Sequence, residues 1–245
     1  KEAYKMQVFA HRGASAYFPE NTLVAFEKAK EMGATGIETD VQVTKDGVLV
    51  LIHDEKVDRT TDGVGYVKDL TFAEIRKLNA GYYMKYFSCK IPTVEEALEL
   101  AKNQNLVINF ELKESCLAFS NTEEKLINTI HKYDMKENVI ISSFHLSSLI
   151  RCRSIDPQIK LAYLTTKVLK LGSLKSLGIE IVHPNYFITT RKFVSHLKQQ
   201  NFRINVFTVN KKKYVERLLK LGVDGLITDV PDIIIEAIKS HKGYT

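Results

Sequence analysis

Residues 6–43 read MQVFAHRGASAYFPENTLVAFEKAKEMGATGIETDVQV, and this stretch holds one complete strand–helix–strand repeat. Its first apolar run, 6–10, predicts a buried strand. The apolar positions of 22–32 recur at helical spacing, between Asn21 as a cap and Gly33 as a stop. The last eight residues predict a second strand. This order of elements favours a parallel sheet covered by helices.

The same alternation continues toward the end of the chain. Further strands are expected at 106–112, 138–142, 159–164, 180–183, 203–209 and 225–228, and helices at 93–104, 122–133, 146–154, 168–177, 190–200, 211–221 and 231–239. With the first repeat this makes about eight strand–helix units, which predict an α/β fold of the (β/α)8 TIM barrel type. A doubly wound open sheet is the alternative, but no Gly-x-Gly-x-x-Gly follows a strand.

The alternation breaks after the second strand. Residues 44–47 (TKDG) form a hairpin-type turn pattern, and 48–52 predict a strand that runs back. Residues 54–92 then lose the rhythm and include the aromatic stretch YYMKYF at 82–87. We therefore expect a single domain over 1–245 with a small insertion after the second strand, and long insertions often act as lids or binding loops.

The amino-acid composition limits which classes of protein the chain can belong to. The chain has 245 residues, of which 44% are hydrophobic, so it can bury a large core. No apolar stretch approaches the roughly 18 residues that span a bilayer, so we expect no transmembrane segment. The three cysteines, Cys89, Cys116 and Cys152, are too few and too scattered for a disulfide framework or a zinc site.

The formal net charge of +6 favours an anionic substrate or surface, although a lysine-rich solvated exterior explains it equally well. We expect no nucleic-acid partner. Low cysteine content and the lack of a visible signal segment favour a cytoplasmic location, while a start at Lys1 rather than methionine leaves secretion open.

Three carboxylates stand where strands are expected to end. Glu38 and Asp40 are two positions apart, so both side chains point to the same face of a strand. Two adjacent carboxylates repel each other unless a cation lies between them, and Glu111 at another strand end could complete the site. Oxygen ligands favour Ca²⁺ or Mg²⁺ over zinc or copper. The alternative is surface charge or a salt bridge to Arg12 or Lys113.

Two histidines, His11 and His53, also follow strand-like runs. Imidazole titrates near neutral pH, so such a pair could supply both the base and the acid that cleavage of a phosphodiester needs. Arg12 and Lys113 could neutralise the phosphoryl oxygens. A purely structural role for each histidine is the alternative.

Several short motifs occur in the order found in one enzyme family. The chain resembles the glycerophosphodiester phosphodiesterases over nearly its whole length, in HRGA (11–14), PENT (19–22), ETDV (38–41), TKDG (44–47), HD (53–54), RTT (59–61), IPTVEEAL (91–98), ELK (111–113), SSF (142–144) and GVDGLITDVP (222–231). Each motif is weak alone, but the ordered combination is specific.

The resemblance implies a (β/α)8 barrel with a small insertion, and hydrolysis of a glycerophosphodiester to glycerol 3-phosphate and an alcohol. In the mechanism proposed for the family, the glycerol 2-hydroxyl attacks phosphorus and a cyclic phosphate follows. The residues that match the family's site are an acid–base pair (His11, His53), metal ligands (Glu38, Asp40, Glu111), phosphate contacts (Arg12, Lys113) and a supporting partner behind them (Glu20).

The chain departs from the family near the substrate. Where the family often has Trp-Thr-Val-Asn, this chain has FTVN at 207–210, and it contains no tryptophan. Phe207 can still pack its face against the glycerol carbons. Where the family often has Asp-Ala-Gly before aromatic residues, this chain has NAGYY at 79–83. These departures bear on glycerol recognition and on the choice of alcohol.

Two other functions are open at this point. A lyase that releases a stable cyclic phosphate from a lysophospholipid would use the same histidines and metal. A non-catalytic module that binds a phosphodiester would be marked by loss of a histidine or a metal carboxylate, and neither is lost here. The expected partner is a small-molecule glycerophosphodiester.

Overall fold

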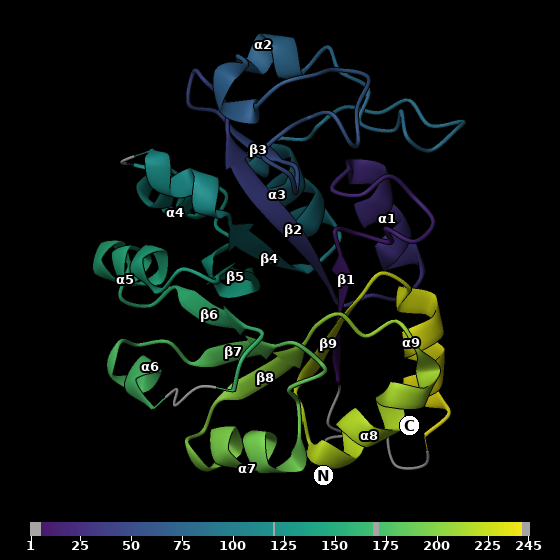
Figure 1. Cartoon of the computed structure of the whole chain (residues 1–245), viewed down its shortest axis with the longest axis vertical. Helices are drawn as coiled ribbons and strands as arrows, with labels where there is room; N and C mark the ends of the chain where they lie inside the picture. Colours follow the sequence, from purple (N-terminus) through teal and green to yellow (C-terminus); the bar gives the residue numbers. More distant parts are fainter. Residues whose placement is uncertain (1–5, 120, 169–171, 242–245) are drawn as a thin grey trace.

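The computed structural model describes residues 6–119, 121–168 and 172–241, and its parallel strands close into a barrel (Figure 1). The barrel closes because β1 pairs in parallel with both β2 and β9. The predicted (β/α)8 barrel is confirmed. Its strands are β1 (Gln7–His11), β2 (Gly36–Val43), β4 (Val107–Leu112), β5 (Val139–Ser143), β6 (Lys160–Thr165), β7 (Ile181–Pro184), β8 (Arg203–Val206) and β9 (Gly225–Thr228).

Helices surround this barrel, and the largest hydrophobic core lies between them and the strands (Figure 1). Of the helix expected at 168–177, residues 169–171 lie outside the described residues. The strand expected at 203–209 is shorter, because β8 ends at Val206. The α-helices outside the insertion are α1 (Leu23–Glu31), α3 (Val94–Asn103), α4 (Thr122–Lys132), α5 (Leu146–Ile155), α6 (Ser173–Ser176), α7 (Arg191–Gln199), α8 (Lys212–Leu221) and α9 (Pro231–Lys239), with 3-10 turns η2 (Glu114–Ala118) and η3 (Lys136–Asn138).

The predicted cap of the first helix is wrong by one residue. Thr22 is the N-cap of α1, and its hydroxyl accepts a hydrogen bond from the Ala25 amide. Asn21 has a left-handed backbone with φ of 55°, and its side-chain amide donates to Asp40 at 2.9 Å. Asn21 therefore supports the carboxylates of β2 instead of the helix.

The segment between β2 and α3 leaves the barrel and lies at the top of Figure 1. The turn predicted at 44–47 is confirmed, since it reverses the chain into β3 (Leu49–Leu51), which pairs antiparallel with β2. Beyond β3 come η1 (Val67–Asp69) and α2 (Phe72–Ile75), over a small core of their own. The assignment of 1–245 to one domain remains a prediction.

The barrel interior changes from apolar to polar along the strands. On β1, Phe9 is followed two residues later by His11, and on β4 Val107 is followed by Asn109 and then Glu111. Alternate residues of a strand share a face, so these side chains line the interior in successive layers. The apolar layer is buried near the amino ends of the strands, and the polar groups lie toward the carboxyl ends.

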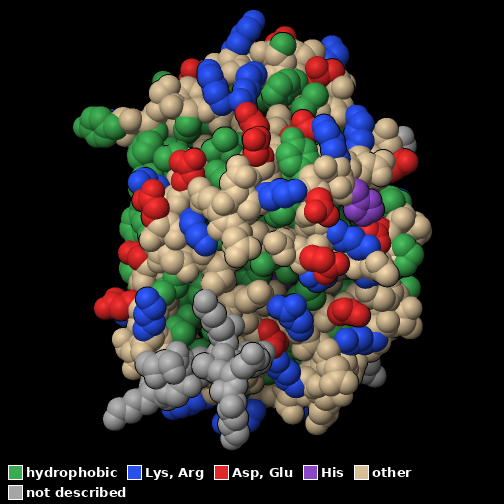
Figure 2. Space-filling view, turned by 180° about the vertical axis from the view of Figure 1, so that it is seen from behind, with side chains coloured by type: hydrophobic (Ala, Val, Ile, Leu, Met, Phe, Trp, Pro, Cys, Tyr) green, Lys and Arg blue, Asp and Glu red, His purple; other side chains and the backbone are tan. Residues whose placement is uncertain are grey.

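On the face seen in Figure 2, basic and acidic side chains are interspersed instead of gathering into one basic patch. Within residues 6–119, 121–168 and 172–241, no helix combines the length and apolar character that crossing a membrane demands.

Candidate active site

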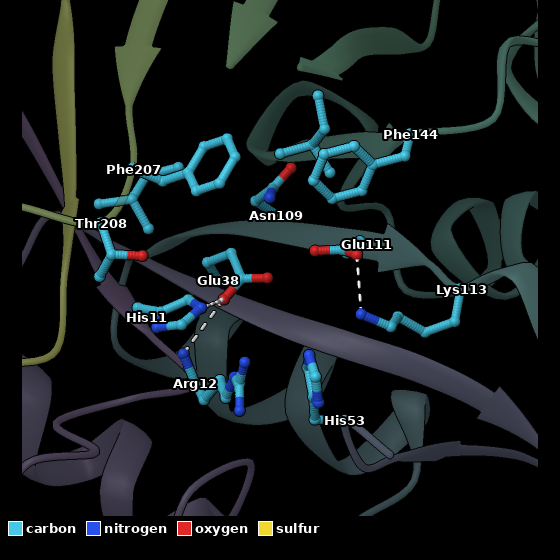
Figure 3. Close-up of a pocket in the computed structure, with 12 residues that line it drawn as sticks. His11, Arg12, Glu38, His53, Asn109, Glu111, Lys113, Phe144, Phe207 and Thr208 are labelled. Atoms are coloured by element: carbon cyan, nitrogen blue, oxygen red, sulfur yellow. Dashed lines mark hydrogen bonds and ion pairs between the residues drawn. The ribbon is translucent and has the colours of Figure 1, made fainter. Parts of the chain in front are cut away.

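The predicted residues of β1, β2 and β4 meet because the strand register aligns them. His11 pairs with Glu38 across β1 and β2, and Asp40 pairs with Glu111 across β2 and β4. His53 arrives from the opposite direction, since β3 runs back along β2 and the Ile52 amide donates to the Asp40 carbonyl at 3.1 Å. All five predicted acid–base and metal residues therefore come together at the carboxyl ends of the strands. Figure 3 shows His11, Glu38, His53 and Glu111 around the cavity there.

Glu38, Asp40 and Glu111 form a compact buried cluster. One oxygen from each carboxylate lies within 4.8 Å of the others, and the residues are 3%, 1% and 9% exposed, respectively. Lys113 Nζ lies 2.9 Å from Glu111 Oε1 and 3.3 Å from Asp40 Oδ1. Three buried carboxylates at this separation cannot all stay ionised without additional positive charge.

The three carboxyl groups differ in acidity. Burial, and next the charge of Asp40, raises the pKa of Glu38 to about 8. The pKa of Glu111 is raised for the same two reasons. Burial also disfavours the charged form of Asp40, but Lys113 and then Arg12 outweigh it and hold the pKa of this carboxyl below its usual range. Of the three carboxyl groups, Asp40 is therefore the one whose charged form the neighbouring cations favour.

The cluster fits a hard divalent cation. Its donors are carboxylate oxygens from two adjacent strands, and such ligands suit Ca²⁺ and Mg²⁺. A cation would also remove the repulsion that raises the pKa of Glu38 and Glu111. Glu38, Asp40 and Glu111 would hold it.

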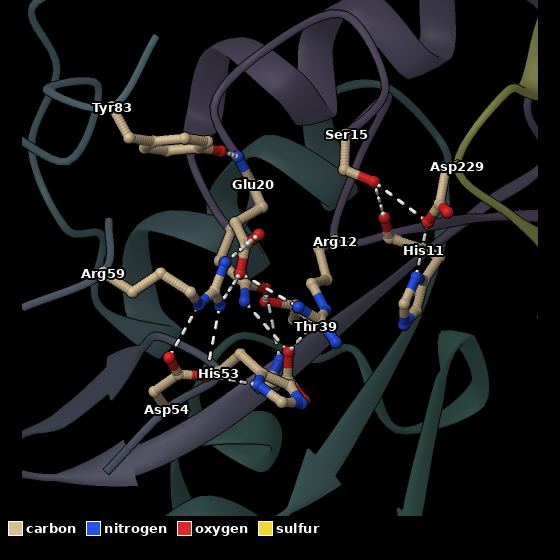
Figure 4. A network of polar contacts seen from close by, with 12 residues as sticks. His11, Arg12, Ser15, Glu20, Thr39, His53, Asp54, Arg59, Tyr83 and Asp229 are labelled. Atoms are coloured by element: carbon tan, nitrogen blue, oxygen red, sulfur yellow. Dashed lines mark hydrogen bonds and ion pairs between the residues drawn. The ribbon is translucent and has the colours of Figure 1, made fainter. Parts of the chain in front are cut away.

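His11 is fixed from the far end of the chain. Its Nδ1 atom lies 2.6 Å from Asp229 Oδ1 (Figure 4). Its Nε2 atom lies 3.8 Å from Glu38 Oε2 (Figure 3). Ser15 Oγ donates to the same Asp229 oxygen at 3.1 Å. Burial disfavours the imidazolium, but the hydrogen bond to Asp229 and the charge of Glu38 together raise the pKa of His11.

His53 has a matching partner next to it in the sequence. Its Nδ1 atom lies 2.7 Å from Asp54 Oδ1, and Asp54 in turn accepts hydrogen bonds from Arg59. These bonds lower the pKa of Asp54 to about 2. Burial, with the nearby charge of Arg12, lowers the pKa of His53, so the two histidines shift in opposite directions.

Arg12 reaches the site from a strained backbone. Its φ is 57°, and its amide donates to the Glu38 carbonyl at 2.8 Å. The guanidinium donates to Glu20 at 3.0 Å, and its Nε atom lies 3.4 Å from Asp40 Oδ2. Arg59 binds both oxygens of Glu20, at 2.9 and 2.7 Å (Figure 4). Glu20 therefore contacts Arg12, and its supporting role, which the family resemblance implies, stays a prediction.

A cavity of about 240 Å³ opens above these groups. Figure 3 shows Phe144 and Phe207 across the cavity from the histidines. The two rings make an edge-to-face contact with centroids 6.1 Å apart. Leu164 and Ile227 extend this apolar wall, and Asn109 also lines the cavity. One side of the cavity is thus charged and the other apolar.

Several residues of the site were not assigned a role from sequence, and three of them stand out. Asp229 and Asp54 hold the two histidines, and Phe144 lines the cavity. Asp229 directly follows the last barrel strand, and Asp54 directly follows His53, so both lie at strand ends where functional groups collect. Phe144 belongs to the motif at 142–144 but gave no chemical signal of its own.

Comparison with known proteins gives consistent matches. The sequence profile of the glycerophosphoryl diester phosphodiesterase family matches residues 11–233. A glycerophosphodiester phosphodiesterase of Caldanaerobacter subterraneus is 43% identical over 239 residues, which cover 96% of this chain and 98% of that protein. A glycerophosphodiester phosphodiesterase of Bacillus altitudinis is 42% identical over 96% of this chain and 99% of its own length.

Solved structures agree with the sequence comparisons. A phosphodiesterase of Oleispira antarctica, in complex with the product sn-glycerol-3-phosphate, superposes with a TM-score of 0.86 at 30% identity. The match covers 97% of this chain and 98% of that structure.

Proposed function

The chain belongs to the glycerophosphoryl diester phosphodiesterase family, and from that premise we propose that two histidines and a divalent metal ion carry its reaction. It is an enzyme of the phosphoric diester hydrolase class. The proposed reaction converts a glycerophosphodiester and water to glycerol 3-phosphate and an alcohol. The structural relative with sn-glycerol-3-phosphate bound supports this product.

The observation that carries the proposal is the matched environment of the two imidazoles. Each has its Nδ1 atom held by a carboxylate, at 2.6 Å for His11 and 2.7 Å for His53. Such a bond fixes the tautomer and leaves Nε2 as the nitrogen available to substrate. Both histidines line the same cavity, so one can accept a proton while the other donates one.

The chain's own groups can supply each step. One histidine removes the proton of the glycerol 2-hydroxyl, whose oxygen forms a bond to phosphorus. The other histidine gives a proton to the alcohol oxygen as its bond to phosphorus breaks. Water then opens the cyclic phosphate with the two proton transfers reversed, which restores both histidines.

Positive charge and shape position the substrate. Arg12 and Lys113 line the cavity and can contact the phosphoryl oxygens, Arg12 through its planar fork. The apolar wall with Phe207 and Phe144 suits the carbon side of glycerol. A divalent ion at Glu38, Asp40 and Glu111, when bound, would offset negative charge that develops on the phosphoryl group.

The test is release of glycerol 3-phosphate from glycerophosphocholine by EDTA-stripped protein, with Ca²⁺, Mg²⁺ or Mn²⁺ added back. We expect the stripped protein to be inactive and one or more of these ions to restore release. Full activity in EDTA would overturn the metal dependence. A cyclic ester that persists in the ³¹P NMR spectrum would favour the lyase over the hydrolase.

A further inference from the structure

A second hollow lies beside the cavity and shares two of its residues. It has a volume of about 360 Å³ and is bounded by the loop 12–20, by Asn210 and by Asp229 and Val230. His11 and Arg12 line both the hollow and the cavity. The two spaces therefore meet at the side chains that the proposed function places next to phosphorus.

We propose that this hollow is the subsite for the alcohol that leaves, an inference that rests on the proposed function. A phosphodiester has two ester arms, and both must be accommodated. The cavity, with its apolar wall, suits the glycerol arm. The second arm needs space that opens from the phosphate position, and the hollow offers it at Arg12 and His11.

The walls of the hollow indicate the class of alcohol. Ser15, Glu20, Asn210 and Asp229 present hydroxyl, carboxylate and amide groups to it. Both carboxylates already have partners, two arginines for Glu20 and the His11 imidazole for Asp229. Their remaining lone pairs can accept hydrogen bonds. The hollow thus suits a small alcohol with its own donors, such as glycerol or ethanolamine.

The same walls argue against a hydrocarbon arm. The apolar side chains that line the hollow are Ala16 and Val230, while the aromatic rings Phe144 and Phe207 line the cavity instead. An alkyl alcohol would desolvate the polar groups of the hollow without replacing their hydrogen bonds.

This position of the alcohol also assigns the acid and base roles to the two histidines. The departing alcohol oxygen lies beside His11 and takes its proton from that imidazole as the bond to phosphorus breaks. The proton of the attacking 2-hydroxyl then goes to His53 as the new oxygen–phosphorus bond forms. In the second step, water loses a proton to His11 and the 2-oxygen regains one from His53.

The test compares esters of glycerol 3-phosphate whose alcohols differ in size. Ala16 is exposed and lines the hollow, so Ala16→Phe should fill it without entering the cavity. The measured quantity is kcat/KM for the glycerol ester divided by kcat/KM for the methyl ester, whose alcohol needs almost no space. We expect Ala16→Phe to lower this ratio by about tenfold or more, the range for a pocket that loses packing or hydrogen bonds.

Ala73→Phe is the matched control, because Ala73 is an exposed alanine of α2 that lines neither space. Its ratio should equal that of the unmodified enzyme. The unmodified enzyme should also prefer the glycerol ester over the propyl ester of similar size. An unchanged ratio in Ala16→Phe, or no preference between glycerol and propyl, would overturn the subsite. Inactivity of the unmodified enzyme toward all of these esters would instead refute the proposed function.

Discussion

The Nδ1 atom of His11 lies 2.6 Å from Oδ1 of Asp229, although 218 positions separate the two residues. The bond connects the end of β1 to the residue that follows β9. The other Asp229 oxygen accepts a hydrogen bond from Asn210 at 2.5 Å, so the carboxylate is itself fixed. This pair orients an imidazole in the way that acid–base catalysis requires.

Asp229→Asn should lower kcat by about 100-fold or more, because an amide cannot stabilise the imidazolium and can select the wrong tautomer. The measurement is kcat with glycerophosphocholine at saturating metal. Asp232→Asn, which removes the carboxylate bonded to the Tyr17 hydroxyl, is the control and should retain activity. Equal activity of both variants would show that Asp229 has no part in orienting His11.

His11→Ala and His53→Ala should each lower kcat by about 10²- to 10⁴-fold, since general acid–base catalysis contributes that much. The metal-free and metal-bound melting temperatures of both variants should show that the fold survives. Retained turnover in both purified variants would refute the acid–base assignment.

Metal binding should appear as a change in melting temperature. A ligand at about 100 times its Kd stabilises the folded state by about 2.7 kcal/mol. Ca²⁺ or Mg²⁺ should therefore raise the Tm of the EDTA-stripped enzyme, and Glu111→Gln should reduce that rise. Glu99→Gln, on the exposed face of α3, should keep it. The same rise in Glu111→Gln and the unmodified enzyme would place the ion elsewhere.

Arg59→Lys should lower kcat/KM by about tenfold, because an ammonium cannot bind Asp54 and Glu20 with paired hydrogen bonds. Without Arg59, Asp54 would hold His53 less firmly, and Glu20 would hold Arg12 less firmly. The kinetic constants of this variant are the measurement.

Arg76→Lys is the control for Arg59→Lys. Arg76 also binds both oxygens of a glutamate, Glu96, but outside the site. It should affect stability and leave kcat/KM unchanged. An equal kinetic loss in the two variants would point to general loosening of the insertion.

Gly13→Ala should destabilise the fold by about 3 kcal/mol, from backbone strain and overpacking together. Gly13 has φ of 82°, and an added Cβ would lie 2.6 Å from Ala25 Cβ. Gly222→Ala separates the two costs, because Gly222 has φ of 73° with no atom within 4 Å of such a Cβ. Urea unfolding should show a clearly smaller loss for Gly222→Ala; equal losses would rule out the steric contribution.

The fold could be predicted because its signals are local. Apolar runs and helical periodicity within a few tens of residues predict each strand–helix unit, and the number of such units predicts the barrel. The pairing of Glu38 and Asp40 could be predicted for the same reason, because two residues that are two positions apart in a strand point to the same face of the sheet. The cap at Asn21 was misassigned because the attraction of its amide to Asp40 is a tertiary contact that no local propensity encodes.

The rest of the site depends on contacts between distant segments. Whether Phe144 reaches Phe207, or Arg59 reaches Glu20, is decided by how β5 faces β8 and how the insertion folds against the loop after β1. Neither pair has a spacing or composition that reveals it. Local pattern and the family resemblance therefore singled out His11, His53, Glu38, Asp40 and Glu111, whose roles stay predictions, while the contacts of Asp229, Asp54 and Arg59 required the three-dimensional structure.

The seam between β1 and β9 joins the first and last barrel strands of the chain. During synthesis His11 is made 218 positions before Asp229, so the imidazole stays without its partner until the last barrel strand has also been made. A prematurely terminated product that lacks the final strand would keep every residue of the acidic cluster and both histidines, yet could not orient His11. Turnover that depends on this pair would then begin only after β9 and Asp229 have joined the barrel.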